Sequence, residues 1–455
     1  MGGTEKSAGR RGPIRLGRTA LSVFASSVLN LVLSFGSSIF LTRTLGVEGR
    51  GEFAIFSASF GILSLLLGFG LDAALRYYVA TDGVPRGRIL TFLIFFALVV
   101  GAFLAGTVHL NDRLFTNEVF LPHSKQTLTF EVVLAGVVAA NTFHSSIASV
   151  FAGTRSFKIL NFAAVGFAVL SLTAYGGLYW LQEANVASIA SEEVFITYLI
   201  LVLFNAAVLG GLAYRTLGVR PSLGLLDRGL LRNMLRYGGV AYAANIVQFL
   251  NYRMDIWIVQ YFAGSAALGL YSLAANLGMM LWILPRSTST VLLPAMAAGD
   301  RGASFEQAAR LGRLVLVASA AAAVPAALLA GQWIGLFYGE DFVGAAKAFA
   351  ILLVGCVPFS LCVVQAGALA AVNQQRVNLT ASGVGLLVTI VLDLSLIPRF
   401  GITGAAIASA ASYVVTTAVV AIAFSRIGSV PLRATFLLQR GDLRYVTDGV
   451  KILLR

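Results

Sequence analysis

Polar side chains recur at helical spacing inside the long apolar stretch between residues 237 and 262. At 100° per residue, Asn245, Gln248, Asn251 and Asp255 fall within about 120° of one another on a helix. Amides and a carboxylate on one face of an apolar helix are suited to line a water-filled cavity that binds a polar solute. The alternative is that they hydrogen-bond to neighbouring helices. The presence of the carboxylate favours the cavity.

Two arginines also lie inside apolar stretches, where a charge is costly. Arg253 and Asp255 are two residues apart and point about 160° away from each other on a helix, which argues against an ion pair between them. Arg286 directly follows Pro285, and Asn276 lies earlier in the same stretch. Each arginine is a candidate to bind an anionic group in the cavity, and the alternative is a structural pair with a carboxylate such as Asp255.

A matching polar face is present near the beginning of the chain, where Asn30 lies among Ser26, Ser34 and Ser37 at helical spacing. Serine also mediates close packing between helices, so this face either lines a cavity or contacts another helix. Asn30 is the member best suited to bind a polar solute.

Other polar residues have simpler interpretations. Asn141 and His144 predict a hydrogen-bonded histidine rather than a proton relay. Asp72 and Arg76 are four residues apart and predict a local salt bridge. Asp393 lies near the end of an apolar run, where we expect solvation at the membrane interface.

Sequence motifs for enzymes and bound metals do not stand out. There is no HExxH zinc signature, no GxxxxGK[ST] phosphate loop and no evident Ser–His–Asp arrangement. Cys356 and Cys362 have neither metal-binding nor redox spacing and are expected to be small buried residues. We therefore expect a protein that is not an enzyme and needs no cofactor or metal.

The composition identifies the elements that position these side chains. Of 455 residues, 58% are hydrophobic and 12% are charged, whereas soluble proteins carry about 25% charged residues. This excludes soluble enzymes, and nucleic-acid binding as well despite the net charge of +13. A membrane-crossing helix needs about 20 apolar residues. Twelve runs of this kind are found, at 19–42, 53–75, 89–109, 127–152, 159–182, 194–214, 237–262, 268–294, 313–332, 345–371, 379–397 and 402–425.

Charge patterning assigns a side to the loops. Most of the 33 lysines and arginines lie in the segments on the same side as the two termini. Because basic loops stay in the cytoplasm, both termini are predicted to be cytoplasmic, in a multi-pass protein of the plasma (inner) membrane. The predicted organisation is a basic tail (1–18), a six-helix bundle (19–214), an amphipathic cytoplasmic linker (215–236), a second six-helix bundle (237–425) and a basic tail (426–455).

A short motif recurs in the two halves at an offset of 218 residues. Gly46, Gly51 and Phe53 follow the first run, and Gly264, Gly269 and Tyr271 follow the seventh. Glycine permits the positive φ of a tight turn, and an aromatic residue suits the membrane interface. Six spans in each half predict a parallel repeat, an arrangement that transporters use to alternate access to a central cavity.

The ordered motifs resemble those of Wzx-type polysaccharide-biosynthesis flippases, members of the multidrug/oligosaccharidyl-lipid/polysaccharide exporter superfamily. No single motif is specific, but their order along all twelve spans is. The matching segments are Leu41-Thr-Arg-Thr-Leu-Gly-Val-Glu-Gly-Arg-Gly-Glu-Phe-Ala, Gly68-Phe-Gly-Leu-Asp-Ala-Ala-Leu-Arg-Tyr-Tyr, Asp255-Ile-Trp-Ile-Val, Gly269-Leu-Tyr-Ser-Leu-Ala-Ala, Phe337-Tyr-Gly-Glu-Asp-Phe-Val-Gly-Ala-Ala and Ile397-Pro-Arg-Phe-Gly-Ile-Thr-Gly-Ala-Ala-Ile-Ala.

The resemblance implies a MATE-like, all-α membrane fold of twelve helices in two bundles, with a polyprenyl-pyrophosphate-linked oligosaccharide as substrate. Cationic cavities in the family suit the pyrophosphate, and Arg253 and Arg286 are the matching candidates here. The implied partners are this lipid-linked oligosaccharide, membrane lipids, a coupling ion unless transport is downhill, and a glycan polymerase and glycosyltransferases by functional association. The protein itself is expected to be a monomer that binds no nucleic acid.

Two other functions stay open. One is a cation-coupled exporter of drugs or metabolites from the same superfamily, which needs acidic cavity residues such as Asp255. The other is a membrane-embedded glycan polymerase or ligase, against which the short external loops argue because such enzymes use a large external domain.

Overall fold

The computed structural model describes residues 13–81, 86–115, 128–216, 227–298, 301–439 and 441–442, and these residues fold entirely into helices and their connections. Within them, ten helices are long and apolar enough to cross a membrane. Two of the ten, α1 (Pro13–Leu67) and α7 (Arg228–Met280), bend at a glycine into two arms each. Twelve crossing segments result, and the predicted all-α membrane fold is confirmed.

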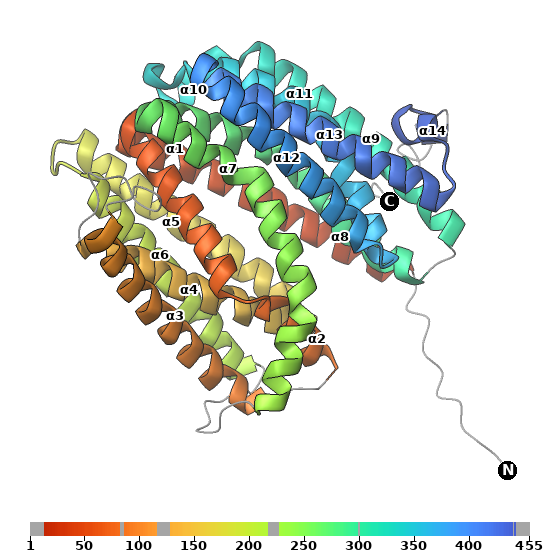
Figure 1. Ribbon diagram of the computed structural model, residues 1–455, viewed down its shortest axis with the longest axis horizontal. Coiled ribbons are helices and arrows are strands. Elements are labelled where there is room, and N and C mark those ends of the chain that lie inside the picture. Colours follow the sequence, from red (N-terminus) through yellow and green to blue (C-terminus); the bar gives the residue numbers. More distant parts are fainter. Residues whose placement is uncertain are drawn as a thin grey trace.

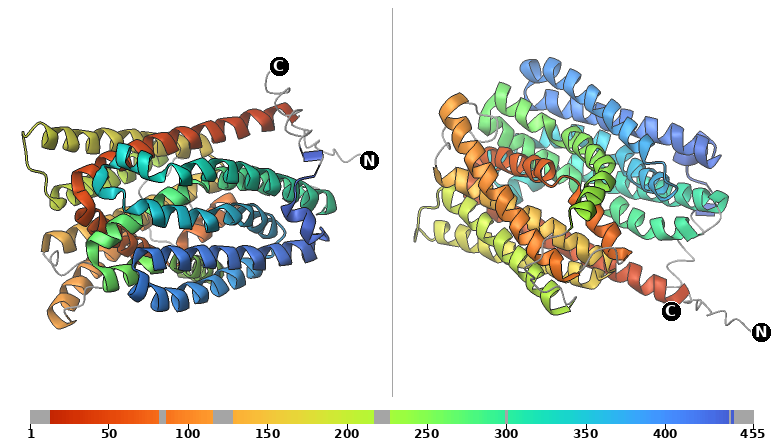
Figure 2. Two further views of the ribbon diagram at one scale, coloured as in Figure 1. Left: turned by 90° about the horizontal axis from the view of Figure 1, so that it is seen from above. Right: turned by 60° about the horizontal axis from the view of Figure 1, so that its bottom comes forward.

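The helices form two bundles, with α7 between them (Figure 1). The N-terminal half also contains α2 (Leu71–Ala80), α3 (Arg86–Phe115), α4 (Leu128–Gly153), α5 (Phe157–Glu183) and α6 (Ser191–Thr216). The C-terminal half follows with α8 (Ile283–Ala298), α9 (Arg301–Leu328), α10 (Ala330–Tyr338), the 3-10 helix η2 (Glu340–Phe342), α11 (Ala345–Ala371), α12 (Gln375–Phe400), α13 (Ile402–Gly428) and α14 (Leu432–Phe436). The Pro13 end of α1 and α14 lie at the same end of the molecule (Figure 2).

The bends in α1 and α7 occur at the two glycines singled out by the repeat. Gly46 has φ 65° and Gly264 has φ 80°, a region that residues with a Cβ rarely occupy. The predicted glycine turns are therefore confirmed. Most of the expected linker lies outside the described residues, but Arg228 to Arg236 continue directly into the first arm of α7 rather than forming a separate element.

The second arm of each long helix breaks again, which the continuous apolar runs did not predict. In the N-terminal half, α1 ends at Leu67, and Phe69 (φ 48°) and Gly70 (φ 70°) turn the chain into α2. In the C-terminal half, α7 ends at Met280 and α8 begins at Ile283. Pro285 lies in the first turn of α8, where the missing proline N–H leaves no hydrogen bond unmade. Each half thus has the same order of arm, bend, arm, break and short helix.

The two halves meet along α1 and α7, and their backbones approach most closely near the bends. We call this the Gly46 end of the molecule. A Cβ added to Gly51 would lie 1.8 Å from the carbonyl oxygen of Ser265, and one added to Gly269 would lie 1.9 Å from that of Val47. The contact is reciprocal, because each glycine belongs to one half and faces the backbone of the other.

Polar groups reinforce the contact at the Gly46 end. Arg43 Nε donates to the carbonyl oxygen of Phe337 at 2.8 Å, and Arg43 Nη2 donates to that of Leu336 at 2.7 Å. The hydroxyl groups of Ser38 and Tyr338 lie 2.8 Å apart. These bonds join α1 to α10 and hold the halves together beside the glycines.

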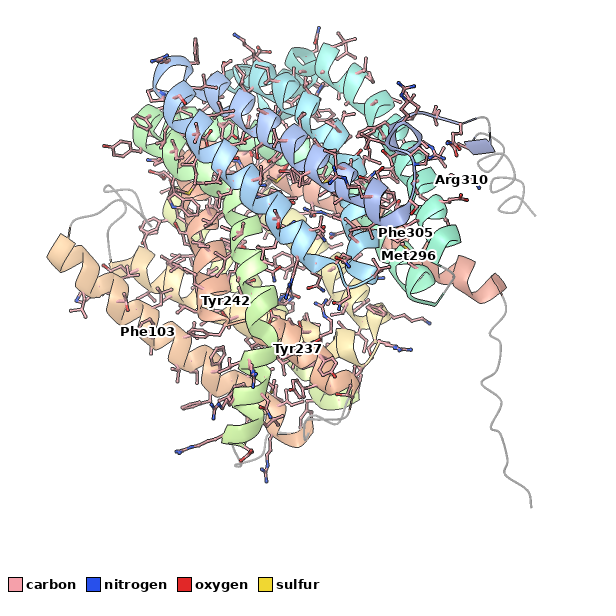
Figure 3. All side chains as sticks on the ribbon, turned by 45° about the vertical axis from the view of Figure 1, so that its right-hand side comes forward. Phe103, Tyr237, Tyr242, Met296, Phe305 and Arg310 are labelled. Atoms are coloured by element: carbon pink, nitrogen blue, oxygen red, sulfur yellow. The ribbon has the colours of Figure 1, made fainter. Side chains whose placement is uncertain are left out.

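A second close approach lies at the opposite end of the same helices, which we call the Gly70 end. A Cβ added to Gly238 would lie 2.4 Å from the carbonyl oxygen of Gly70. Beside it, Tyr242 donates from its hydroxyl to the carbonyl oxygen of Leu66 at 2.9 Å. Tyr237 and Tyr242 both extend from the first arm of α7 (Figure 3). The halves are therefore in backbone contact at both ends of the first arm of α7.

The segment after α13, which the sequence predicts only as a basic tail, folds back onto the beginning of α9. Asp442 is fully buried and accepts hydrogen bonds from Arg313 Nε at 2.7 Å and Nη2 at 2.8 Å. Arg313 Nη1 donates to the carbonyl oxygen of Ala434. Arg310 lies one turn earlier on α9, near Phe305 (Figure 3), with its Nε 3.4 Å from Asp442. We call this arrangement the Asp442 latch.

Candidate functional site

Three adjoining pockets run from one half of the molecule to the other. The central pocket, about 350 Å³, lies between the halves and is lined by Asp72 and Ser145 of the N-terminal half and by Asn245 and Gln248 of α7. Its volume is within the usual range of ligand sites. Asn245 and Gln248 are thus placed at a cavity.

The C-terminal pocket, about 370 Å³, shares Gln248 and Tyr252 with the central pocket. Its further polar lining includes Arg286 of α8, Asn378 of α12 and Thr416 of α13. Arg286 is the one lysine or arginine among the residues that line the three pockets. An anionic group of a ligand would therefore be attracted to this end of the row.

The N-terminal pocket, about 380 Å³, lies inside the other bundle and shares Asn141 with the central pocket. We call it the amide pocket, because Asn30 of α1, Asn141 of α4 and Asn205 of α6 line it together with His144. Asn30 is therefore also at a cavity. The shared residues place the three pockets side by side in a row.

A cluster of aromatic rings positions Arg286. Trp282 is fully buried, donates from its indole N–H to the carbonyl oxygen of Cys356 at 3.3 Å, and packs against Phe359 with ring centroids 4.7 Å apart. The Cζ atom of Arg286 lies 5.8 Å from the Trp282 ring centroid, in the range of a cation–π interaction. Tyr252 packs against the same tryptophan at 5.5 Å. The buried Trp282, which lies in the break before α8, thus helps to hold the Arg286 guanidinium at the C-terminal pocket.

Arg253 lies differently. Its Nη1 donates to Asn276 Oδ1 at 3.2 Å, and neither residue is among those that line the three pockets. The sequence argument that Arg253 and Asp255 point apart agrees with the hydrogen bonds of Asp255, which come from Tyr271 in the second arm of α7 and from Ser409 in α13.

Asn251 and Asp255 face the interior of the C-terminal bundle and are almost fully buried. Asn251 Oδ1 accepts from Ser412 at 3.0 Å and from Thr389 at 3.3 Å. Asp255 Oδ2 accepts from the Tyr271 hydroxyl and from Ser409 at 3.1 Å. The polar stripe of α7 is therefore divided: one part lines the pockets, and the other hydrogen-bonds to the second arm of α7 and to α12 and α13.

Asp393 corrects the sequence interpretation. It was expected to be solvated at the interface, but its side chain is completely buried, and neither carboxylate oxygen has a hydrogen-bond partner. Asp255 Oδ1 is also without a partner, and the two carboxylates interact electrostatically. A carboxyl group in such surroundings must either be protonated or be paired with a cation.

The groups around Asp255 fit a proton or a hard cation better than a transition metal. Asp255 accepts hydrogen bonds from the hydroxyl groups of Tyr271 and Ser409, and oxygen ligands are those that hard cations prefer. Among the described residues, no cluster of three or more His, Cys, Asp or Glu side chains is suited to a metal ion.

Three other interpretations can be compared with the structure. His144 Nε2 lies 3.1 Å from Asn205 Nδ2, so the predicted hydrogen-bonded histidine is confirmed. Asp72 accepts hydrogen bonds from Ser145 at 3.3 Å and Ser146 at 3.1 Å of α4, and the predicted local salt bridge with Arg76 is not among the ion pairs of the described residues. Both buried cysteines are free, as expected.

The sequence did not single out Asn205 or Ser145, and it assigned Asp393 to the interface instead of the interior. A signal existed for Asp393, because Thr389 precedes it by one turn and the two share a helix face. For Asn205 and Ser145, a lone amide or hydroxyl in an apolar helix gives no indication of direction.

Comparison with known proteins places this geometry in a family. The family model described as "Polysaccharide biosynthesis protein" matches residues 16–299. The probable low-salt glycan biosynthesis flippase Agl15 of Haloferax volcanii is 22% identical over 407 residues, which cover 88% of this chain and 82% of the relative.

Solved structures show the same fold. A lipid II flippase MurJ in an inward closed conformation superimposes with a TM-score of 0.71 and 14% identity, covering 97% of each chain. A MATE family multidrug resistance transporter in an inward-facing conformation superimposes with a TM-score of 0.65 and 14% identity, covering 90% of this chain and 98% of the transporter. Since the family model matches more than half of the sequence, the chain belongs to the polysaccharide biosynthesis protein family.

Proposed function

We propose that the protein is a flippase that moves a polyprenyl-pyrophosphate-linked oligosaccharide from the cytoplasmic to the external leaflet of the plasma membrane. The row of three pockets carries this proposal: it crosses from one half to the other, is lined by uncharged polar groups along much of its length, and has an arginine at one end. The hydroxyl groups of a glycan bind to uncharged polar groups, and a pyrophosphate binds to an arginine. Membership of the polysaccharide biosynthesis family and the likeness to Agl15 support it.

Alternating access is the proposed mechanism. The two halves have the same order of helices and are in contact at both ends of the first arm of α7, so one contact opens while the other stays closed in this mechanism. We place both termini in the cytoplasm, because most basic residues lie in the segments on the same side of the membrane as the termini. The Gly46 end then faces outward and the Gly70 end faces the cytoplasm. The protein catalyses no chemical step in this scheme.

Replacing Arg286 with alanine tests the proposal. A charge-assisted hydrogen bond to an anion contributes about 1.5–3 kcal/mol, so we expect substrate affinity to fall about 10- to 100-fold and surface glycan to decline while the protein stays in the membrane. Arg286→Lys should retain part of the activity because it retains the charge. Arg426→Ala is the matched control, since Arg426 is exposed at the end of α13. Surface glycan and membrane protein level are measured in cells.

We propose Arg253 as the second arginine that binds the pyrophosphate. We expect the pyrophosphate to reach Arg253 only after the two halves have moved relative to each other. An Arg253→Ala variant should then reduce export without reducing affinity for substrate in the arrangement described here. Normal surface glycan in the Arg253→Ala, Arg286→Ala double variant would exclude both arginines as pyrophosphate ligands.

We further propose that a proton or monovalent cation at Asp255 and Asp393 couples transport to an ion gradient. Replacing Asp393 with asparagine keeps the shape and removes the charge, so transport in proteoliposomes should no longer respond to an imposed sodium or proton gradient. Asp341→Asn is the control, because Asp341 is exposed in η2. An unchanged gradient response of Asp393→Asn would show that the ion acts elsewhere or that transport is downhill.

A cation-coupled exporter of drugs or metabolites is the second candidate function. The buried pair Asp255 and Asp393 and the fold shared with MATE transporters favour it. Drug resistance on overexpression, with no change in surface glycan when the gene is deleted, would establish this alternative. A glycan polymerase or ligase would instead be revealed by polymerisation with the purified protein. Neighbouring genes for glycosyltransferases would favour the flippase, whose functional partners they encode.

A further inference from the structure

The amide pocket has an unusual composition for a site that faces a charged substrate. Its polar lining includes Asn30, Ser34, Asn141, His144 and Asn205, and none of its lining residues is Asp, Glu, Lys or Arg. A phosphate in this pocket would have no cation to neutralise it, and a carboxylate-bearing sugar would have none either. The pocket therefore suits an uncharged polar ligand.

His144 adds to this neutrality. Asn205 Nδ2 lies 3.1 Å from His144 Nε2, an arrangement that fits a neutral imidazole, because an amide N–H donates and needs a ring nitrogen that accepts. The side chains of Asn30, Asn141 and Ser34 each offer both a donor and an acceptor, as does every hydroxyl group of a sugar.

Aromatic rings complete the lining. Phe167 of α5 and Tyr198 of α6 line the same pocket and provide flat apolar surface beside the amides. A pyranose has an apolar C–H face and a rim of hydroxyl groups, so it needs both kinds of surface. With a volume of about 380 Å³, the pocket is within the range of sites for small ligands.

The two outer pockets differ in charge and are joined through the central one. Asn141 connects the amide pocket to the central pocket, and Gln248 and Tyr252 connect the central pocket to the one that contains Arg286. One ligand with a neutral end and an anionic end therefore fits the row in a single direction.

We infer that the amide pocket is a subsite for an uncharged sugar of the transported glycan, while the pocket around Arg286 receives the pyrophosphate. This inference rests on the proposed flippase function and adds a direction to the bound substrate. It also gives the two halves different tasks: the N-terminal half selects the sugar and the C-terminal half holds the anion. A bound substrate then contacts both halves at once.

Binding of two probes to the purified full-length protein tests the division. The probes are polyprenyl pyrophosphate and the same lipid linked to N-acetylglucosamine, a neutral sugar. Asn205→Leu should weaken binding of the glycosylated probe about three- to tenfold, the effect of losing one or two hydrogen bonds, and leave binding of the bare pyrophosphate unchanged. Arg286→Ala should weaken both. Asn233→Leu, at an exposed site on the first turns of α7, is the matched control.

The possible outcomes distinguish failure of the sugar subsite from failure of the proposed flippase function. Equal affinity of wild type and Asn205→Leu for the glycosylated probe overturns the subsite, as does an equal loss for both probes. Asn30→Leu and Ser34→Ala repeat the measurement on α1, so the result does not depend on one variant folding. If the wild type binds neither probe while it binds drug cations, the flippase function itself fails, and the subsite fails with it.

Discussion

Replacing Gly269 with alanine is expected to open the molecule at the Gly46 end. The added Cβ would lie 1.9 Å from the carbonyl oxygen of Val47, whereas side-chain carbons essentially never approach another atom within 3.0 Å. The clash is with backbone, so no rotamer change relieves it, and the helices must separate by about 1 Å. Overpacking of this kind costs about 1–3 kcal/mol, which shifts the ratio of open to closed molecules about 5- to 100-fold.

The separation can be measured between spin labels at Glu48 and Tyr261, which are exposed on opposite halves at this end. The native Cys356 and Cys362 are buried and should not compete for labelling. Gly269→Ala should lengthen the distance and favour conformations open at the Gly46 end. Gly106→Ala is the control, because a Cβ there meets no atom within 4 Å.

The opposite end provides a variant with the reverse effect. Gly238→Ala should push the halves apart at the Gly70 end, since its Cβ would lie 2.4 Å from the Gly70 carbonyl oxygen. Gly239→Ala, at the adjacent residue with no atom within 4 Å, should leave the distances unchanged. Identical distance distributions in Gly269→Ala, Gly238→Ala and the wild type would show that these contacts do not control opening.

Loss of the Asp442 latch is expected to produce the largest change in stability. Asp442→Ala leaves the Arg313 guanidinium buried without its carboxylate, and breaking one partner of a buried pair costs about 3–5 kcal/mol. The midpoint of thermal unfolding of the purified protein should fall by several degrees. Glu306→Ala is the matched control, because Glu306 is exposed on the same helix. Replacing both Arg313 and Asp442 with leucine should cost less than replacing Asp442 alone, since no buried charge is left unpaired.

The latch also gives stability a defined dependence on pH. The hydrogen bonds from Arg313 lower the pKa of Asp442 below its usual value. A lowered carboxyl pKa stabilises the folded state above the pKa of the unfolded chain, about 3.9, and this contribution is lost as the pH falls through the lower folded value. The stability difference between wild type and Asp442→Ala should therefore be constant near neutral pH and shrink below about pH 4. A difference that grew on acidification would contradict this account.

Sequence patterns predicted the crossing segments and the two glycine turns because both depend on local properties. An apolar run of sufficient length must cross the membrane as a helix, and Gly46 and Gly264 mark positions where the helix direction reverses. The breaks before α2 and α8 were not predicted. Phe69 has a positive φ although it has a side chain, and an apolar run gives no indication of such a backbone conformation.

The polar stripe of α7 shows why the site was only partly predictable. Helical periodicity correctly placed Gln248, Asn251 and Asp255 on one broad face, but α7 lies between two different environments. Gln248 meets the pockets, while Asn251 and Asp255, which lie within about 60° of it around the helix axis, hydrogen-bond to α12, α13 and the second arm of α7. The sequence shows which polar side chains share a helix face, but it does not show which neighbouring helix or pocket each of them contacts.

Asp393 illustrates the same limit in another way. Its distance from the end of an apolar run suggested the interface, yet helix α12 continues to Phe400 and turns this side chain inward. The position of a residue along a helix does not determine whether its side chain points to lipid or to the protein interior. For a lone polar residue, a single sequence shows only the position along the helix.

The contact at the Gly46 end has a consequence for the way the transporter can sense protons. It is made by glycine backbones, by hydroxyl groups and by Arg43, whose guanidinium does not lose its proton in proteins. These contacts therefore carry no charge that changes near neutral pH. A response of the outward opening to pH must come from other groups, among them the buried Glu52 beside Gly51 and the buried carboxylates of the C-terminal bundle.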